Sequence, residues 1–136
     1  MPTRYDDSYA PVILLHVTGP STNEEVLERI EYLKAVLKRR QPLALVFDAT
    51  GAEPINAHQR RMWSQWLATD EKVIRAWMMG CAFVVTSAIM RGVFTGIFWI
   101  WPPPMPYVFT STRSEAIAWA NERLRGGARG RTSPTS

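Results

Sequence analysis

The sequence has little of the chemistry that marks most enzymes. Its 136 residues include one cysteine, Cys81, and two histidines, His16 and His58. A single cysteine excludes an intrachain disulfide and suits a reducing compartment. The histidines are not at metal-ligand spacing with each other or with Cys81. No GxGxxG, P-loop or GxSxG motif is present. We therefore expect no metal, no cofactor and no familiar catalytic constellation.

Two further absences bear on location and partners. The first residues, MPTRYDDSYA, lack the basic start and apolar run of a signal peptide, so we expect a cytoplasmic protein. The net charge of +4 comes largely from KAVLKRR and from the terminal RLRGGARGRTSPTS. Cations are favoured in the last turn of a helix, and the terminal segment has the composition of a solvated tail. We therefore expect no nucleic-acid partner.

No charged residue lies between Arg91 and Arg113. An uncharged segment of about 20 residues is nominally long enough to span a bilayer. The prolines of PPPMP, however, end any helix at residue 102. The remaining segment, 92–101, predicts a helix that is apolar around most of its circumference. Such a helix must be covered by the domain, a second copy or lipid. We predict an apolar-ligand, dimer or membrane face formed by Arg91, Phe94, Phe98, Trp99 and Trp101.

Apolar runs alternate with amphipathic stretches along the chain. Strands are predicted in APVILLHVTG, PLALVFDATG, MMGCAFVVTS and PYVFTS, with helices after each. Capping boxes predict helix starts at Thr22 and Asn56, and Thr69-Asp70 predicts a break in the second helix. The pattern predicts an α/β fold with one mixed, mainly parallel sheet of four to five strands and about four helices. We divide the chain into an arm or short edge strand (1–10), a domain (11–125) and a disordered basic tail (126–136).

The best polar cluster lies in FDATGAEPINAHQRR. Loops at the carboxyl ends of strands commonly bind ligands in open α/β sheets, and the following helix start offers N–H groups to an anion. Capping and turn roles explain the same residue types. The predicted partner- or ligand-binding residues are Asp48, Thr50, Asn56, His58 and Arg61. An enzymatic alternative places His58 as a general base beside Asp48 and Arg60 or Arg61.

The order of elements, with HVTG, LVFDATG and AIAWANERL at matching places, resembles the SpoIIAA-like family over residues 11–124. That family belongs with the STAS domains of the anti-sigma-factor-antagonist type, and its shape is compared with CRAL-TRIO lipid-transfer domains. The resemblance implies a domain that works by binding, without catalysis. In regulatory STAS domains a partner kinase phosphorylates a serine or threonine at the start of the helix after the second long strand. Residues 54–58 carry no hydroxyl there, and Thr50 is the nearest.

Two hypotheses follow for function. The first is a non-enzymatic regulatory or protein-interaction module, with a protein partner and self-association as a homodimer. The alternative is an apolar-ligand-binding or peripheral membrane protein that uses the aromatic helix 92–101, with a lipid or membrane surface as its partner.

Overall fold

Five strands form one sheet in the order β1-β2-β3-β4-β5. The computed structural model describes residues 4–6, 11–100 and 102–132, with side chains for 11–100 and 102–126. β2, β3, β4 and β5 are parallel, and the short edge strand β1 runs antiparallel to β2. The predicted mixed, mainly parallel sheet is therefore confirmed. The strand bounds are β1 (Arg4–Asp6), β2 (Val12–Gly19), β3 (Leu43–Ala52), β4 (Met78–Val84) and β5 (Tyr107–Thr110).

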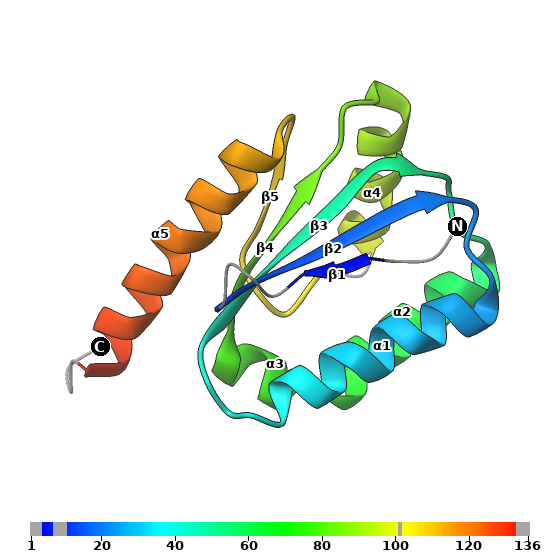
Figure 1. Cartoon of the computed structure of the whole chain (residues 1–136). Helices are drawn as coiled ribbons and strands as arrows, with labels where there is room; N and C mark the ends of the chain where they lie inside the picture. Colours follow the sequence, from blue (N-terminus) through cyan, green and yellow to red (C-terminus); the bar gives the residue numbers. More distant parts are fainter. Residues whose placement is uncertain (1–3, 7–10, 101, 133–136) are drawn as a thin grey trace.

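The helices cover the two faces of the sheet unequally. Three crossovers link the parallel strands, and each adds its new strand on the same side of the last one. Because such crossovers are right-handed, their helices all lie on one face, while the helix after β5 covers the other (Figure 1). In chain order these helices are α1 (Asn23–Leu37), α2 (Ala57–Thr69), α3 (Glu71–Trp77), α4 (Ala88–Ile100) and α5 (Arg113–Thr132).

The predicted helix boundaries follow local hydrogen bonding. At the start of α1, Thr22 Oγ1 accepts from Glu25 N at 3.1 Å and Glu25 Oε1 accepts from Thr22 N at 2.8 Å. Asn56 and Gln59 form the same reciprocal pair at the start of α2. The predicted break at Thr69-Asp70 separates α2 from α3, so the described residues form five helices where about four were expected.

Side chains alternate between two apolar layers across the sheet. Residues such as Leu45 and Cys81 face α1 to α4, and their neighbours Ala44 and Ala82 face α5. The second layer is narrow because small residues meet there: Ala116 and Ala120 of α5 are fully buried. Small side chains let the backbone of a helix approach a sheet closely, and α5 lies against β3 and β4 in this way.

Gly80 of β4 lies directly against α5. A Cβ atom at this position would lie 2.7 Å from Cη2 of Trp119 and 3.1 Å from Cγ of Arg123. Arg123 also donates from Nε to the carbonyl of Met79 at 3.3 Å. The Trp119 ring can therefore pack directly against the backbone of β4 only because residue 80 has no side chain.

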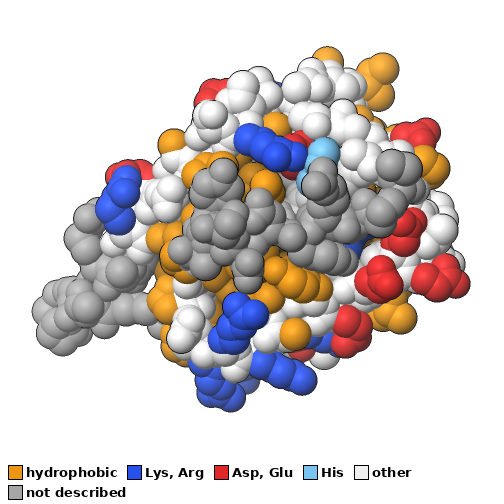
Figure 2. Space-filling view, in the orientation of Figure 1, with side chains coloured by type: hydrophobic (Ala, Val, Ile, Leu, Met, Phe, Trp, Pro, Cys, Tyr) orange, Lys and Arg blue, Asp and Glu red, His pale blue; other side chains and the backbone are white. Residues whose placement is uncertain are grey.

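Acidic and basic side chains lie at opposite ends of α1. Glu24 and Glu25 occupy the first turn of α1 and Lys34 the last, as the helix dipole favours. In Figure 2 acidic side chains gather toward one end of this helix and basic ones toward the other.

The helix α5 continues to Thr132, so the domain boundary predicted at residue 125 lies inside it.

A candidate ligand cavity beneath helix α4

An apolar cavity of about 140 Å³ lies between α4, α2 and the sheet. Leu45, Phe47 and Phe83 form its floor, and the helices provide its two walls. An engineered cavity of about 150 Å³ in another protein binds benzene, so the space matches a six-carbon group. The wall residues are Trp63, Trp66 and Leu67 from α2, and Met90, Val93, Phe94, Ile97 and Phe98 from α4.

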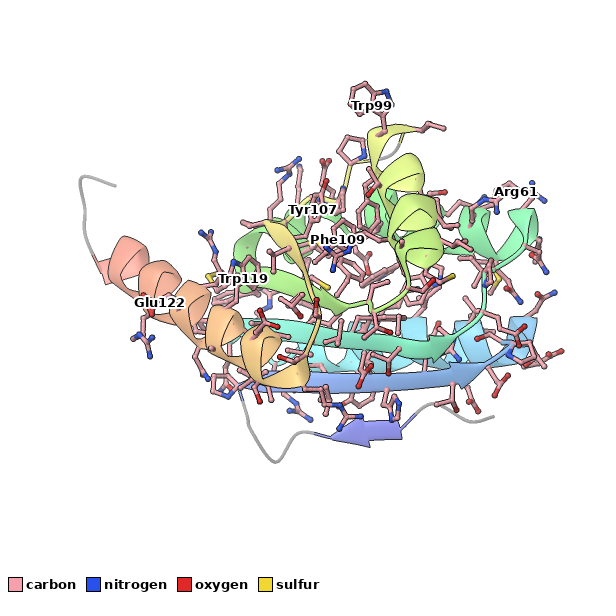
Figure 3. The ribbon with its side chains drawn as sticks, turned by 90° about the horizontal axis from the view of Figure 1, so that it is seen from above. Arg61, Trp99, Tyr107, Phe109, Trp119 and Glu122 are labelled. Carbon is pink, nitrogen blue, oxygen red and sulfur yellow. The ribbon has the colours of Figure 1, made fainter. Side chains whose placement is uncertain are left out.

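Aromatic rings fix one end of α4 to the sheet. Phe94 and Phe98 have ring centroids 5.3 and 5.2 Å from that of Phe83. Phe98 also stacks on Phe109 at 6.1 Å and meets Tyr107 edge-on at 4.9 Å. In Figure 3 Tyr107 and Phe109 of β5 lie beside α4. The helix thus rests on a few large rings, which hold it above the sheet and leave space beside them.

No residue of α4 is fully buried, although it is a strongly apolar helix. Phe94 and Phe98 are half-buried, as expected for an inner face, whereas Trp99 is 86% exposed. Figure 3 shows the Trp99 side chain projecting away from the body of the molecule. Ile89 and Ile100 are also exposed. The remaining predicted residue of this face, Trp101, lies outside the described residues.

Arg91 is directed toward the protein. Its Nη2 donates to the carbonyl of Val85 at 3.2 Å, and its guanidinium carbon lies 6.0 Å from the Phe109 ring centroid. It is half-buried. Arg91 therefore anchors the first half of α4, in addition to any contact it makes at the surface.

Polar groups line the cavity at the end formed by the carboxyl termini of β2 and β3. Ser21 and Glu53 follow these strands, and Arg60 lies in the first turns of α2. Arg29, in the middle of α1, also lines the cavity and is 1% exposed. Met78, at the amino end of β4, lines the opposite end. Since the carboxyl ends of parallel strands meet at one edge of the sheet, Ser21, Glu53 and Arg60 lie toward one end of the cavity and Met78 toward the other.

Asp48, which the sequence places in a binding cluster, belongs to the opposite face of the sheet. Its Oδ2 accepts from Nε of Arg113, on α5, at 2.5 Å, and its Oδ1 accepts from the amide and the hydroxyl of Thr50. Burial on its own would raise the pKa of Asp48, but hydrogen bonds from Arg113 and Thr50 hold that pKa below its usual value. Asp48 is thus a charged link between β3 and α5.

Asn56, His58 and Arg61, the other predicted polar residues apart from Thr50 of β3, lie at the start of α2 or in its first turns. Asn56 Oδ1 accepts from Gln59 N at 2.8 Å, a capping role, while His58 and Arg61 are exposed. Arg61 projects outward in Figure 3. The enzymatic alternative with Asp48, His58 and Arg60 or Arg61 is not assembled, because the Asp48 carboxylate faces α5 and α2 covers the other face. The Nη1 atom of Arg60 donates to the carbonyl of Ile55 at 3.1 Å.

Cys81 lies in the cavity floor and is 1% exposed. Burial raises the pKa of its thiol far above the ordinary value, so it acts as a small apolar residue, as predicted. Among the described residues no three His, Cys, Asp or Glu side chains gather as metal ligands. Within the same residues, every helix is too short or too polar to cross a bilayer.

The residues that sequence reasoning missed are polar ones that line the cavity. Arg29 lies three residues after Val26 and four before Leu33, within the stripe that helical periodicity assigns to the core. A cation inside that stripe was the available signal. The pairing of Asp48 with Arg113 joins positions 65 residues apart, and no local pattern marks it.

Together these features define an α/β domain with a SpoIIAA-like, or STAS-like, fold. The crystal structure of an uncharacterized protein of the DUF3478 family with a SpoIIAA-like fold, from Shewanella loihica PV-4, matches with a TM-score of 0.62. The match has 16% sequence identity and covers 87% of this chain and 91% of that chain. The resemblance found in the sequence is therefore confirmed at the level of the fold. No protein-family model and no curated protein matches the sequence.

Proposed function

We propose that this protein is a non-enzymatic binding module that holds a small, apolar-tailed ligand beneath α4. The observation that carries the proposal is the cavity of about 140 Å³, walled by α2 and α4 and lined almost entirely by apolar side chains. Largely preformed apolar cavities with a few polar groups are the usual form of small-molecule sites. Phe94 and Phe98 of α4 pack on Phe83 and Phe109 of the sheet, and this packing supports a role for α4 as the cover of the site.

The proposal keeps the regulatory role expected from the sequence. Ligand occupancy would be the signal, and Asn56, His58 and Arg61, near the start of α2, would meet a protein partner. Since α2 forms one wall of the cavity, a ligand that moves this wall would alter the same helix that carries those residues. Self-association and lipid contact through the exposed Trp99 stay predictions.

The test is a titration with 1-hexanol, a neutral probe whose six carbons match the cavity. Methyl resonances in a ¹H–¹³C NMR spectrum report the site directly. Saturable shifts are expected at Leu33, Leu67 and Ile97, which line the cavity, and not at Leu27, which is exposed. Shifts spread evenly over the surface, or no saturation, would contradict the proposal.

Two substitutions on the same helix provide a matched control. Ile97→Trp adds volume at a side chain that lines the cavity, whereas Thr95→Trp adds it two residues earlier, at an exposed position on the other side of the helix. We expect hexanol binding to be lost in Ile97→Trp and retained in Thr95→Trp, with both variants showing the far-UV circular dichroism of the wild type.

A further inference from the structure

The outer face of α4 carries no charged side chain. Residues three, four or seven apart on a helix share a face. The exposed residues of α4 follow this spacing and are Ala88, Ile89, Gly92, Thr95, Gly96, Trp99 and Ile100. Their side chains offer two polar groups, the indole N–H of Trp99 and the Thr95 hydroxyl, which donates to the carbonyl of Arg91 at 2.8 Å. Because the outer face of a surface helix is normally polar, this face is suited to an apolar neighbour outside the domain.

The two ends of this face protrude beyond its middle. Gly92 and Gly96 occupy the middle, and a Cβ atom at either position would meet nothing within 4 Å. Ile89, Trp99 and Ile100 are 78%, 86% and 64% exposed, and in Figure 3 the Trp99 ring stands clear of the ribbon. An indole combines an apolar ring with one N–H donor, and such side chains gather at the boundary between lipid and water.

Charge distinguishes α2 and α4 from α1, which packs on the same side of the sheet. α2 and α4 carry Arg60, Arg61 and Arg91 and no acidic residue. Arg61 is exposed and projects outward in Figure 3. The acidic residues of this layer lie on α1, in NEEVLERIEYLKAVL, in the connections at Glu53 and Asp70, and at Glu71, which pairs with Arg75. The surface formed by α2 and α4 is therefore apolar and positive, and it complements a surface that is apolar and negative.

We infer that the outer face of α4 docks on the surface of an anionic phospholipid bilayer. Trp99 and Ile100 enter the boundary between head groups and acyl chains, and Arg61 meets the head groups beside them. The inner face of α4 stays packed on the sheet through Phe94 and Phe98, so the helix lies along the bilayer. A second copy of the chain fits less well, because a twofold contact joins identical patches and would bring the arginines of both copies together.

Flotation with extruded vesicles measures this docking. Vesicles of phosphatidylcholine provide an uncharged surface, and vesicles of equimolar phosphatidylcholine and phosphatidylglycerol provide an anionic one. We expect the wild type to bind the anionic vesicles at least about tenfold more tightly, because each cation near such a surface contributes roughly fivefold in affinity. Raising the salt concentration should weaken the binding, since salt screens exposed charges.

Two matched pairs of variants locate the contact. Trp99→Gln and Leu27→Gln each remove an exposed apolar side chain, one from α4 and the other from α1. We expect Trp99→Gln to lower the affinity for anionic vesicles at least about tenfold, and Leu27→Gln to leave it within about twofold, because only the indole enters the lipid. Arg61→Gln should lower the affinity about fivefold, and Arg39→Gln, which removes an exposed cation beyond the end of α1, should not.

Gly96→Leu separates a bilayer from a second copy as the occupant of this face. A leucine fits there because the space is open, and it adds apolar surface, so it should strengthen binding to vesicles. Two helices that met at Gly92 and Gly96 would instead be forced apart, since close packing at a G-x-x-x-G spacing depends on the lack of side chains.

Size-exclusion chromatography with light scattering completes the test. A monomeric wild type, together with tighter vesicle binding by Gly96→Leu, supports the inference. A dimer that Gly96→Leu dissociates would assign the face to a second copy and overturn it. Equal binding to the two kinds of vesicle, or undiminished binding by Trp99→Gln, would also overturn it. The docking does not need an occupied cavity, so its failure would leave the proposed function to the hexanol titration.

Discussion

The ion pair of Asp48 and Arg113 joins the middle of the sheet to the first turn of α5. Asp48 is 3% exposed, while the Arg113 side chain is 45% exposed. A buried carboxylate that accepts three hydrogen bonds must stay ionised for the link to hold, and its lowered pKa shows that the bonds outweigh the cost of burial. At the scale of single residues, this pair is a structural contact rather than part of a binding site.

Replacement of Asp48 tests that assignment. We expect Asp48→Asn to lower the free energy of unfolding by about 1–3 kcal/mol at pH 7, because the charge-assisted bond from Arg113 is lost. Since the folded pKa of Asp48 lies below its unfolded value, this contribution is complete above the unfolded pKa and disappears as the pH falls through the folded pKa. Urea unfolding of both proteins between pH 7 and pH 3 should therefore show the difference shrinking toward acid pH.

A surface ion pair provides the control for this measurement. Glu71 and Arg75 pair at 2.9 Å with both side chains at least half exposed, and such pairs contribute little. Glu71→Gln should change the free energy of unfolding by less than about 0.5 kcal/mol. An equal effect of the two substitutions, or a constant difference across the pH range, would show that Asp48 acts through something other than its charge.

At the scale of elements, the packing of α5 on the sheet depends on the lack of a side chain at Gly80. We expect Gly80→Ala to destabilise the protein by about 1–3 kcal/mol, because its Cβ would overlap the Trp119 ring and force that ring to shift. Thermal or urea unfolding measures the effect.

Two comparisons show whether the overlap is the cause. Gly92→Ala on α4 meets nothing within 4 Å and should stabilise by roughly 0.5–1 kcal/mol, as alanine does in helix interiors. In a background that carries Trp119→Leu, the cost of Gly80→Ala should be smaller, which a double-mutant cycle quantifies. An unchanged cost in that background would place the constraint in the strand.

The elements were largely predictable from the sequence, whereas the site was predictable only in part. Alternation of residues such as Leu43 and Leu45 with Ala44, and the capping box of Thr22 and Glu25, are local signals that need no knowledge of the fold. The predicted polar cluster joined Asp48 to His58 because they are ten residues apart in the chain. The pleat of β3 turns the Asp48 side chain to the face opposite α2, and side-chain direction on a strand whose two faces are both apolar is not marked in the sequence.

At the scale of the whole molecule, stability is expected to be uneven. The central strands β2, β3 and β4 carry most of the fully buried side chains, whereas α4 has none. Native-state hydrogen exchange should therefore find the amides of α4 opening well below the global free energy of unfolding, and those of β3 at the global value. Saturation with a ligand of the cavity should slow exchange in α4 in particular. Exchange of α4 only by global unfolding would contradict its role as a cover.

The one-sided arrangement of the crossovers also bears on the order in which the chain can fold during synthesis. Val12, Leu14, Val46 and Val84 belong to the strands and share an apolar layer with Ala116 and Ala120 of α5, which follows all of them in the sequence. As the chain leaves the ribosome, α1 to α4 can assemble on their face while the other face still lacks its partner. Domains gain their full stability only when their last contacts form, and exposed apolar strands invite aggregation until then. The apolar face of the sheet that packs with α5 is therefore exposed to solvent from the synthesis of β2 until α5 folds onto it.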